Sequence, residues 1–284
     1  MTIAYEVFDD RVCQLGEGPL WHPLRAELFW TDIERDLILS RGEQQGKGEY
    51  RLPCKPSALG WVDENRLFVG TDRGLEVFDL RDQSLAMVCS IEQDQPERRS
   101  NDGRADPWGG FWISTMTHAM EPGLGRIYRW YQGELRALID GLACPNAICF
   151  SPDRKVGYYA DSMPGKIYCH DLDPETGWPM AEARVFAEGQ KGAPDGAVTA
   201  RDGTVWNAEW GQGRLLAFDP DTGALNQHFD LPARQLTCPA IDPETGRVFV
   251  TSAAVQLKDA KTTDGQTFVL DLQVDAAPEP AVAL

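Results

Sequence analysis

The sequence has no CxxC pair, no long apolar run and no excess of basic residues, and each absence excludes a class of protein. The seven cysteines are odd in number and lie mostly in apolar surroundings, which predicts reduced thiols and a cytoplasmic location rather than a disulfide framework. No apolar run reaches the roughly 18 residues that a membrane-spanning helix needs. The opening MTIAYEVFDDRV lacks the basic and apolar regions of a secretory signal peptide, so none is expected.

Positive charge is also scarce. The 27 Lys and Arg residues face 44 Asp and Glu residues, which gives a formal net charge of −17. A field of this sign repels nucleic acid and anionic membrane surfaces, so we expect neither as a partner. No feature of the sequence specifies an oligomeric state.

Several catalytic motifs are missing as well. No GxSxG segment is present, which argues against a serine hydrolase. No GxGxxG segment follows a β-like run, which argues against a dinucleotide site. With only four histidines in the chain, a zinc site built from three histidines is not expected.

What the sequence does contain is a repeat of short β-rich segments. Each holds an apolar or aromatic residue, and successive ones lie 39 to 47 residues apart. These residues are Phe29, Phe68, Trp112, Tyr158, Val205 and Phe249. Further β-like runs and Gly- or Pro-marked turns flank most of them. A unit of four short antiparallel strands is typical of a β-propeller blade.

We therefore predict an all-β fold, a six-bladed β-propeller, as a single domain over residues 1–284. The last unit lacks an outer strand after TFVLDL, and the N-terminal segment IAYEVFDD can supply it. Closure by this strand would protect the open edges of the sheets. The alternative, two stacked β-domains, predicts a linker near the middle of the chain, and the sequence has none.

Four polar residues share a register within the repeat. They stand 10 to 12 residues before the repeated apolar position, each close to Gly or Pro: Glu17, Asn101, Asn146 and Asp195. This register predicts that they converge at one end of the central channel. Two carboxylates and two amide carbonyls form an oxygen-rich cation site. The alternative is that they are ordinary polar residues of turns, but the shared register favours the cation site.

The segments LGEGPLW, SNDGRADPWGGFWISTM, PNAICFSPD and PDGAV resemble motifs of the senescence-marker-protein/gluconolactonase (luciferin-regenerating-enzyme-like) family of six-bladed propellers. The resemblance runs in the family's order from about residue 13 to about residue 255. It implies a lactonase that hydrolyses a sugar (aldono-) lactone to the aldonic acid. It also implies one divalent metal ion bound by Glu17, Asn146 and Asp195, and substrate contacts from Arg99 and Asn101. Calcium, magnesium, manganese, zinc and iron(II) are the candidate metals.

The chain departs from this family in one place. Animal-like gluconolactonases carry acidic residues after the Thr-Met pair, whereas this sequence has Thr117, His118 and Ala119. His118 is therefore a candidate substrate contact on the rim of the site, and the alternative is a solvated loop histidine. The departure leaves the lactonase class in place and bears on which sugar is bound.

A mechanism follows from these assignments. Asp195 is expected to be the general base for the attacking water, Glu17 the anionic anchor of the metal and Asn146 its neutral ligand. Asp102 is expected to support the site through hydrogen bonds, while Asp32 and Asp161 are interpreted as groups of turns or of blade packing, with a position close to the channel as the alternative for either. The competing hypothesis is a non-catalytic, metal-binding propeller that captures a small ligand or a protein, because one fold hosts many functions.

Overall fold

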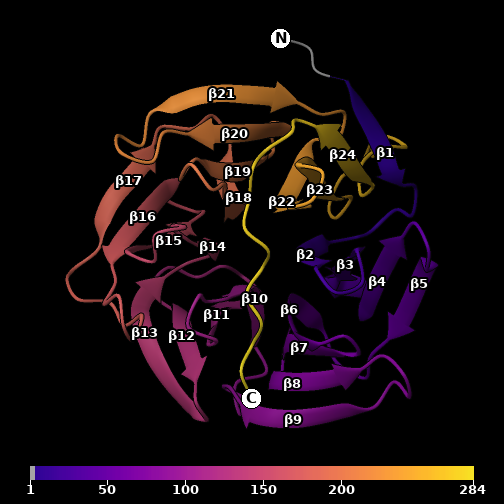
Figure 1. Cartoon of the computed structure of the whole chain (residues 1–284). Coiled ribbons are helices and arrows are strands. Elements are labelled where there is room, and N and C mark those ends of the chain that lie inside the picture. Colours follow the sequence, from indigo (N-terminus) through magenta and orange to yellow (C-terminus); the bar gives the residue numbers. More distant parts are fainter. Residues whose placement is uncertain (1–3) are drawn as a thin grey trace.

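The computed structural model describes residues 4–284, in which almost all regular structure is β-strand. The sheets surround a common axis, and the chain winds around it in sequence order (Figure 1). The one helical element in these residues is the three-residue 3₁₀ turn η1 (Ile33–Arg35), so no helix there is long or apolar enough to cross a bilayer.

Four sheets each contain four consecutive antiparallel strands, ordered from the axis outward. Their strands are β2 (Gly16–His22), β3 (Glu27–Asp32), β4 (Leu37–Gly42) and β5 (Gly46–Arg51); β6 (Pro56–Asp63), β7 (Arg66–Thr71), β8 (Gly74–Asp79) and β9 (Leu85–Ser90); β10 (Arg98–Ala105), β11 (Phe111–Thr117), β12 (Gly125–Tyr131) and β13 (Glu134–Leu142); and β14 (Pro145–Phe150), β15 (Val156–Asp161), β16 (Lys166–Asp171) and β17 (Arg184–Glu188).

The remaining strands form one sheet of eight. Its order is β1-β24-β23-β22-β19-β20-β21, with β18 paired to β19. The strands are β1 (Tyr5–Asp9), β18 (Ala193–Thr199), β19 (Val205–Trp210), β20 (Arg214–Phe218), β21 (Leu225–Asp230), β22 (Gln235–Ile241), β23 (Arg247–Ala253) and β24 (Thr267–Asp271).

The all-β propeller fold is confirmed, but the predicted count of six blades is wrong. The structure has four four-stranded blades and one eight-stranded sheet. The difference arises at one backbone contact, where Trp210 at the end of β19 pairs with Gln235 at the start of β22. This pairing joins β18–β21 to β22–β24 and β1. A repeat in the sequence shows the order of the strands along the chain. It does not show whether the strands of two neighbouring units form backbone hydrogen bonds with each other.

The N-terminal segment does supply an outer strand, as the sequence predicts. Strand β1 pairs antiparallel with β24, with Tyr5 opposite Leu270 and Val7 opposite Phe268. Ile3, the first residue of the predicted segment, lies outside the described residues. The first and last strands of the chain therefore close the ring together.

Alternation along the second strand of each blade explains why the repeated segments are apolar on both faces. In β3, Leu28 and Trp30 pack into one hydrophobic cluster, whereas Phe29 packs into the next. Successive side chains of a strand point to opposite faces, so each such strand fills two interfaces between neighbouring sheets. In β11 the fully buried Trp112 likewise packs into one cluster, whereas its neighbours Phe111 and Ile113 pack into another.

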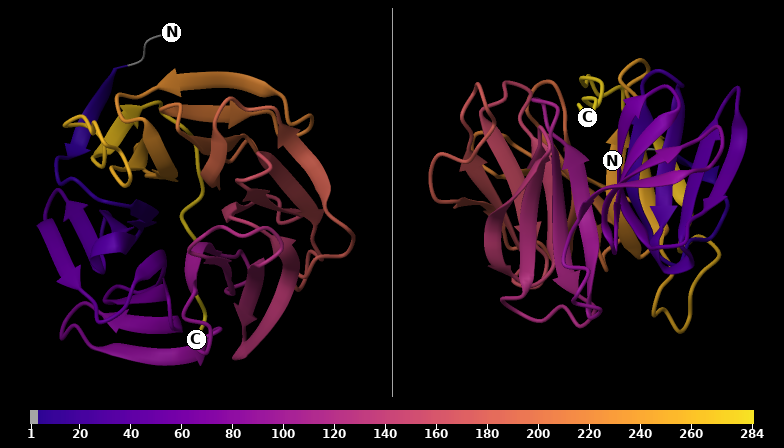
Figure 2. Two further views of the ribbon diagram at one scale, coloured as in Figure 1. Left: turned by 180° about the vertical axis from the view of Figure 1, so that it is seen from behind. Right: turned by 90° about the horizontal axis from the view of Figure 1, so that it is seen from below.

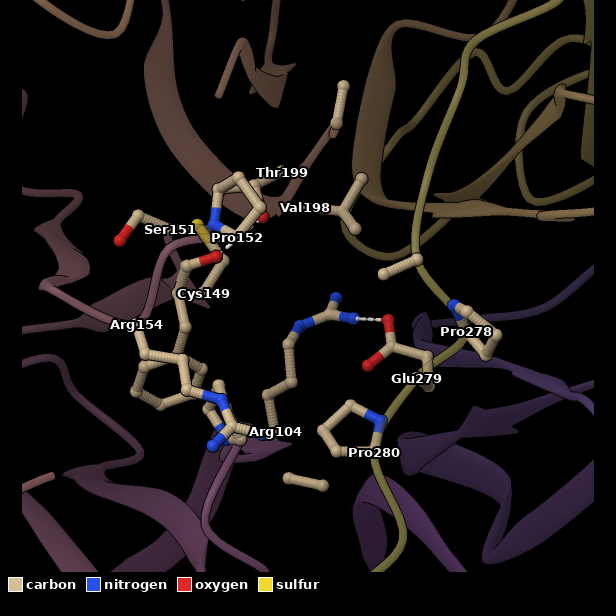
Figure 3. Close-up of a pocket in the computed structure, with 15 residues that line it drawn as sticks. Arg104, Cys149, Ser151, Pro152, Arg154, Val198, Thr199, Pro278, Glu279 and Pro280 are labelled. Atoms are coloured by element: carbon tan, nitrogen blue, oxygen red, sulfur yellow. Dashed lines mark hydrogen bonds and ion pairs between the residues drawn. The ribbon is translucent and has the colours of Figure 1, made fainter. Parts of the chain in front are cut away.

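The C-terminal segment (residues 273–284) crosses one end of the axis, as Figures 1 and 2 show. The indole Nε1 of Trp61 donates to the carbonyl of Glu279 at 2.8 Å, and the amide of Val282 donates to the carbonyl of Trp61 at 2.8 Å. The Glu279 carboxylate forms an ion pair with Arg104 on β10. A cavity of about 250 Å³ remains beside this pair (Figure 3). We call this the strap end of the axis.

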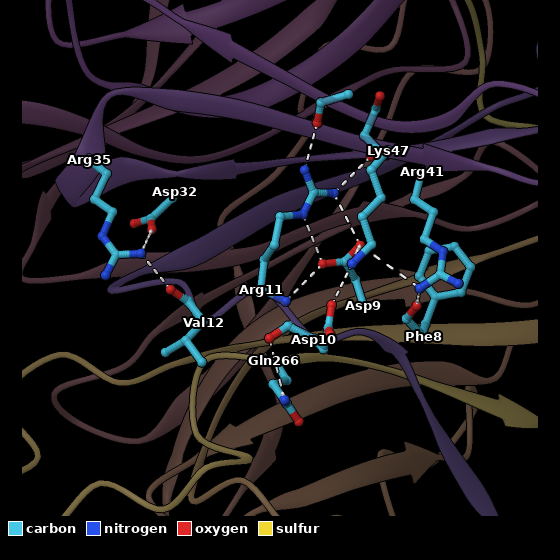
Figure 4. Close-up of polar contacts among 12 residues, drawn as sticks. Phe8, Asp9, Asp10, Arg11, Val12, Asp32, Arg35, Arg41, Lys47 and Gln266 are labelled. Atoms are coloured by element: carbon cyan, nitrogen blue, oxygen red, sulfur yellow. Dashed lines mark hydrogen bonds and ion pairs between the residues drawn. The ribbon is translucent and has the colours of Figure 1, made fainter.

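A buried carboxylate fastens the closing strand to the first blade (Figure 4). Asp9 is fully buried, and its Oδ1 accepts hydrogen bonds from the backbone amide and Nε of Arg11 at 3.0 and 2.9 Å. The guanidinium of Arg11 also donates to the carbonyls of Ser40 and Gly48 at 2.8 and 2.7 Å. Asp9 and Arg11 thereby connect the eight-stranded sheet to β4 and β5.

Substituting Asp9→Asn should lower the free energy of unfolding by roughly 2 kcal/mol, because it removes the buried charge that pairs with the half-buried guanidinium of Arg11. The matched control is Asp10→Asn, whose side chain is 73% exposed, and it should change stability by less than about 0.5 kcal/mol. Urea denaturation measures both variants. Equal destabilisation by the two would contradict this role for Asp9.

Candidate active site

All six site residues predicted from the sequence line one pocket of about 290 Å³. They are Glu17, Arg99, Asn101, His118, Asn146 and Asp195. The pocket lies at the end of the inner strands opposite the strap end. Strand β10 shows this directly, since its residues Arg99 and Asn101 line the pocket while Arg104 lines the cavity beside the C-terminal segment.

Breaks in strand register place these side chains. Each inner strand loses its regular pairing where a site residue stands: β2 between Glu17 and Leu20, β10 between Ser100 and Gly103, β14 between Asn146 and Cys149, and β18 between Pro194 and Ala197. Such bulges re-aim side chains and are frequent beside active sites. The polar positions that repeat in the sequence are therefore positions of bulges. Each of these bulges turns a polar side chain toward the axis.

Two of these bulges use a left-handed backbone. Gly18 follows Glu17 with φ of 53°, and Ala147 follows Asn146 with φ of 56°. At Gly18 a Cβ atom would lie 2.7 Å from the carbonyl oxygen of Ser57, so only glycine fits. Ala147 holds the same conformation despite its Cβ, and it is fully buried. A strained backbone held in place by packing is a known property of functional sites.

A directed series of hydrogen bonds connects the amides of the pocket. Arg99 Nη1 donates to Asn101 Oδ1 at 2.8 Å, and Asn101 Nδ2 donates to Asn146 Oδ1 at 2.9 Å. Asn146 Nδ2 in turn donates to Ser162 Oγ at 2.9 Å. This series fixes which atom of each amide is the oxygen.

The surroundings of the pocket's carboxylates disfavour their ionised forms. Burial, followed by the charge on Asp102, raises the pKa of Glu17 to about 8. Burial, followed by the charges on Glu17 and Asp102, raises the pKa of Asp195 well above its usual range. Arg99 is the cation of this pocket, and burial lowers its pKa. The charge on Glu17 therefore opposes the ionisation of Asp195, and a cation bound between two such buried acids would stabilise their charged forms.

The oxygen atoms of these residues fit a divalent cation. Asp195 is buried, and its Oδ1 has no hydrogen-bond partner among residues 4–284. Within the same described residues there is no group of three or more His, Cys, Asp and Glu side chains placed to hold a metal ion. Any cation would therefore need the amide oxygen of Asn146 in addition to the carboxylates of Glu17 and Asp195, a donor set that suits oxygen-seeking ions.

The supporting acids behave as expected from the sequence. Asp102 accepts hydrogen bonds from the amides of Ile148 and Gly103 at 2.7 and 2.8 Å, so its carboxylate holds β14 beside β10. Asp161 accepts from the amides of Ala143 and Cys144, both at 3.0 Å, just before Asn146. Asp32 accepts from the amides of residues 14 and 15, just before Glu17. These acids shape the backbone that leads into the site.

His118 lies at the mouth of the pocket on the loop after β11, and it is exposed. The sequence did not predict that the carboxylate of Glu34 also lies at this mouth. Glu34 of η1 lines the pocket, and its carboxylate lies 3.4 Å from Lys55 Nζ. Glu34 belongs to the first blade and is far from Thr117 in the sequence, so the motif around Thr117 gave no signal for it.

The rest of the pocket wall is largely apolar. Its lining includes Leu15, Met116, Met120, Cys144, Met163, Trp210 and Val255. Burial raises the pKa of the Cys144 thiol to about 12, so this group is a neutral wall residue. Trp210 lines the pocket, whereas Trp206 packs into a hydrophobic cluster. Residues on the loops between strands supply much of this wall, and their approach is set by the ring rather than by local sequence.

Comparison with known proteins gives matches along nearly the whole chain. Residues 15–254 match the family model described as the SMP-30/gluconolactonase/LRE-like region. The chain is 34% identical over 259 residues to the L-arabinolactonase of Azospirillum brasilense, covering 88% of this chain and 84% of that protein. It is 31% identical over 296 residues to a pentonolactonase of Haloferax volcanii, covering 98% of this chain and 97% of that protein.

A solved structure agrees in backbone as well. The crystal structure of a calcium-binding protein, regucalcin, from Agrobacterium tumefaciens superposes with a TM-score of 0.96 and 34% sequence identity, covering 100% of this chain and 99% of that one. The match in sequence spans the strands that carry every residue of the pocket's polar end. The chain belongs to the SMP-30/gluconolactonase/LRE-like family.

Proposed function

We infer that this chain is a sugar lactonase, an enzyme that hydrolyses the ester bond of an aldonolactone to give the aldonic acid. The observation that carries this inference is the polar end of the pocket, where the buried acids Glu17 and Asp195 meet Asn146, Arg99 and Asn101. The chain shares this family with relatives named as lactonases for a pentose sugar. The neutral, oxygen-rich lactone is a ligand that a chain of charge −17 does not repel.

Glu17, Asn146 and Asp195 are the residues that would hold a divalent metal ion. Such an ion, when bound, supplies Lewis-acid polarisation of the lactone carbonyl. The two carboxylates offer negative charge to it, and the Asn146 amide offers a neutral oxygen. An all-oxygen set of this kind agrees with calcium, magnesium or manganese, and zinc and iron(II) are the further candidates.

We propose that Arg99 and Asn101 orient the substrate. The guanidinium of Arg99 is held by its bonds to Asn101 Oδ1 and to the carbonyl of Ser100, both at 2.8 Å. Its remaining N–H groups are donors for the carbonyl or hydroxyl oxygens of a sugar lactone. His118 at the mouth is a further donor or acceptor for the exocyclic end of the sugar.

Asp195 is the proposed general base. In the reaction, the oxygen of a water molecule attacks the lactone carbonyl carbon while Asp195 accepts a proton of that water. The bond between the carbonyl carbon and the ring oxygen then breaks. The ring oxygen takes the proton from Asp195 and becomes the hydroxyl of the open acid, which leaves Asp195 ionised again. The free Oδ1 of Asp195 is the atom that supports this assignment.

The state of the cysteines agrees with a reducing compartment. All seven cysteines are free, and six of them are buried, as expected for a cytoplasmic enzyme. We therefore propose a cytoplasmic location.

Substituting Asp195→Asn should abolish most of the turnover, lowering kcat by roughly 10²- to 10⁴-fold, because an amide accepts no proton from water. Glu17→Gln is the matched variant, and it should instead weaken metal binding, with part of the rate restored by excess metal. Lactone hydrolysis releases a proton, so a pH-indicator assay on an aldonolactone panel follows both variants. A metal titration of each protein gives its metal affinity.

Turnover near the wild-type level in Asp195→Asn with metal bound would show that another group activates the water. Absence of hydrolysis by the wild-type protein on every lactone, with metal bound, would favour the non-catalytic binding protein.

Substituting Arg99→Ala should lower kcat/KM by roughly 100-fold, since it removes charge-assisted hydrogen bonds to the substrate. Metal affinity should remain within about two-fold of the wild type, because Arg99 is no metal ligand in this assignment. Arg99→Lys keeps the charge without the planar fork and should lie between the two. A loss of metal binding equal to the loss of kcat/KM would place Arg99 in the metal site.

The raised pKa of Glu17 predicts how the metal-free protein responds to pH. Between its ordinary value of 4.5 and about 8, Glu17 keeps a proton in the folded protein that it loses in the unfolded chain. Stability therefore falls as pH rises through this window. The melting temperature of metal-free wild type should drop between these pH values, and Glu17→Gln should drop less.

Added Mn²⁺ should reverse this trend, because a cation favours the ionised carboxylates. The stabilisation by Mn²⁺ should accordingly be larger at the upper end of the window than at the lower end. Differential scanning fluorimetry measures both effects. An identical pH profile for metal-free wild type and Glu17→Gln would contradict the assignment.

A further inference from the structure

Ser162 holds a position that connects two segments of the pocket. It follows β15 directly and lines the pocket. Its Oγ accepts a hydrogen bond from Asn146 Nδ2 at 2.9 Å and donates one to the carbonyl of Pro194 at 2.7 Å. Pro194 precedes Asp195 in β18, so the hydroxyl bridges the four-stranded blade of Asn146 and the eight-stranded sheet of Asp195.

The backbone of Ser162 is itself fixed. Its amide donates to the carbonyl of Cys144 at 3.0 Å, and its carbonyl accepts from the amide of Gly165 at 3.2 Å. Cys144 stands two residues before Asn146. The hydroxyl is therefore presented from a turn that is anchored to the same segment it supports, which limits the positions that Oγ can take.

Ser162 also contributes to the orientation of the Asn146 side-chain amide. Asn146 Oδ1 accepts from Asn101 Nδ2, and Asn146 Nδ2 needs an acceptor on its other side. Ser162 Oγ is that acceptor, and the other recorded contact of Nδ2 is Cys144 Sγ at 3.8 Å. Sulfur is a weak acceptor, so without the hydroxyl the amide keeps the bond that Asn101 donates to its oxygen but loses the strong bond that holds its NH₂ end.

We propose that Ser162 is a positioning residue that orients the Asn146 amide oxygen toward the pocket and sets the spacing between Asn146 and Asp195. It acts through these two residues, because its hydroxyl oxygen accepts from Asn146 and its hydroxyl proton is donated to the carbonyl of Pro194. The proposal rests on the proposed function for what Asn146 and Asp195 bind. Groups that orient a ligand in this way commonly change metal affinity or activity by roughly 10- to 100-fold when removed.

The test uses Ser162→Ala, with Ser151→Ala as the matched control. Ser151 precedes β15 as Ser162 follows it, and its hydroxyl also makes hydrogen bonds, but it lines the cavity at the strap end. Isothermal titration with Mn²⁺ alone should show an affinity at least about 10-fold weaker for Ser162→Ala. Ser151→Ala should bind Mn²⁺ as the wild type does, and both metal-free proteins should melt within about 2 °C of each other.

A double-mutant cycle separates positioning from a general loss of stability. Because Ser162 acts in part through Asn146, the loss of Mn²⁺ affinity in the double variant Ser162→Ala/Asn146→Ala should be smaller than the sum of the two single losses. Full additivity of the two losses would overturn the proposal. Wild-type Mn²⁺ affinity in Ser162→Ala would overturn it as well.

A readout without metal or substrate keeps the proposal distinct from the proposed function. The side-chain amide protons of Asn146, followed by NMR in the metal-free protein, should shift and exchange faster with water in Ser162→Ala. If the wild type binds no metal and hydrolyses no lactone, the proposed function fails, while these amide signals still decide the role of Ser162. Unchanged Asn146 signals in Ser162→Ala would overturn the positioning role.

Discussion

Burial of two carboxylates in one pocket is the constraint on which the rest of the structure depends. Glu17 and Asp195 are both buried, and their ionisation is opposed by burial and by neighbouring negative charge. Burying two carboxylates together costs free energy, so the surrounding backbone must hold the two side chains in place. The bulges of the inner strands, with a left-handed residue after Glu17 and after Asn146, supply that rigidity. The fold thus combines local backbone strain with two acids that are buried side by side.

Rigidity at the pocket in turn depends on closure of the ring. The pocket draws its polar residues from three of the blades and from the eight-stranded sheet, so a small opening of the ring would separate them. Strand β1 and the buried Asp9 close the ring at its outer side. The C-terminal segment ties the eight-stranded sheet to the blade of Trp61 at the strap end. The two terminal segments thus stabilise the closed ring, although neither contributes a residue to the lining of the pocket.

Much of the site could be predicted from the sequence because it repeats. Glu17, Asn101, Asn146 and Asp195 occupy corresponding places in a periodic chain, and corresponding places in a ring converge. The number of separate sheets could not be predicted, since it depends on the single pairing between Trp210 and Gln235. Ser162 and Glu34 were missed for a related reason. Both lie just after strands, where polar residues are common, and their importance comes from a neighbour in another part of the ring.

The path of the C-terminal segment fixes which face of the molecule is available for attachment. Ala283 donates its amide hydrogen to the carbonyl of Gly109 at 2.9 Å, and Leu284 is exposed at the strap end. The loop between β23 and β24, which carries Val255 and Gln256 of the pocket lining, projects from the other end of the ring (Figure 2). A tether joined to Leu284 would therefore hold the protein on a solid support with its pocket facing the solution. The same geometry lets a fused domain follow the chain without standing over the pocket mouth.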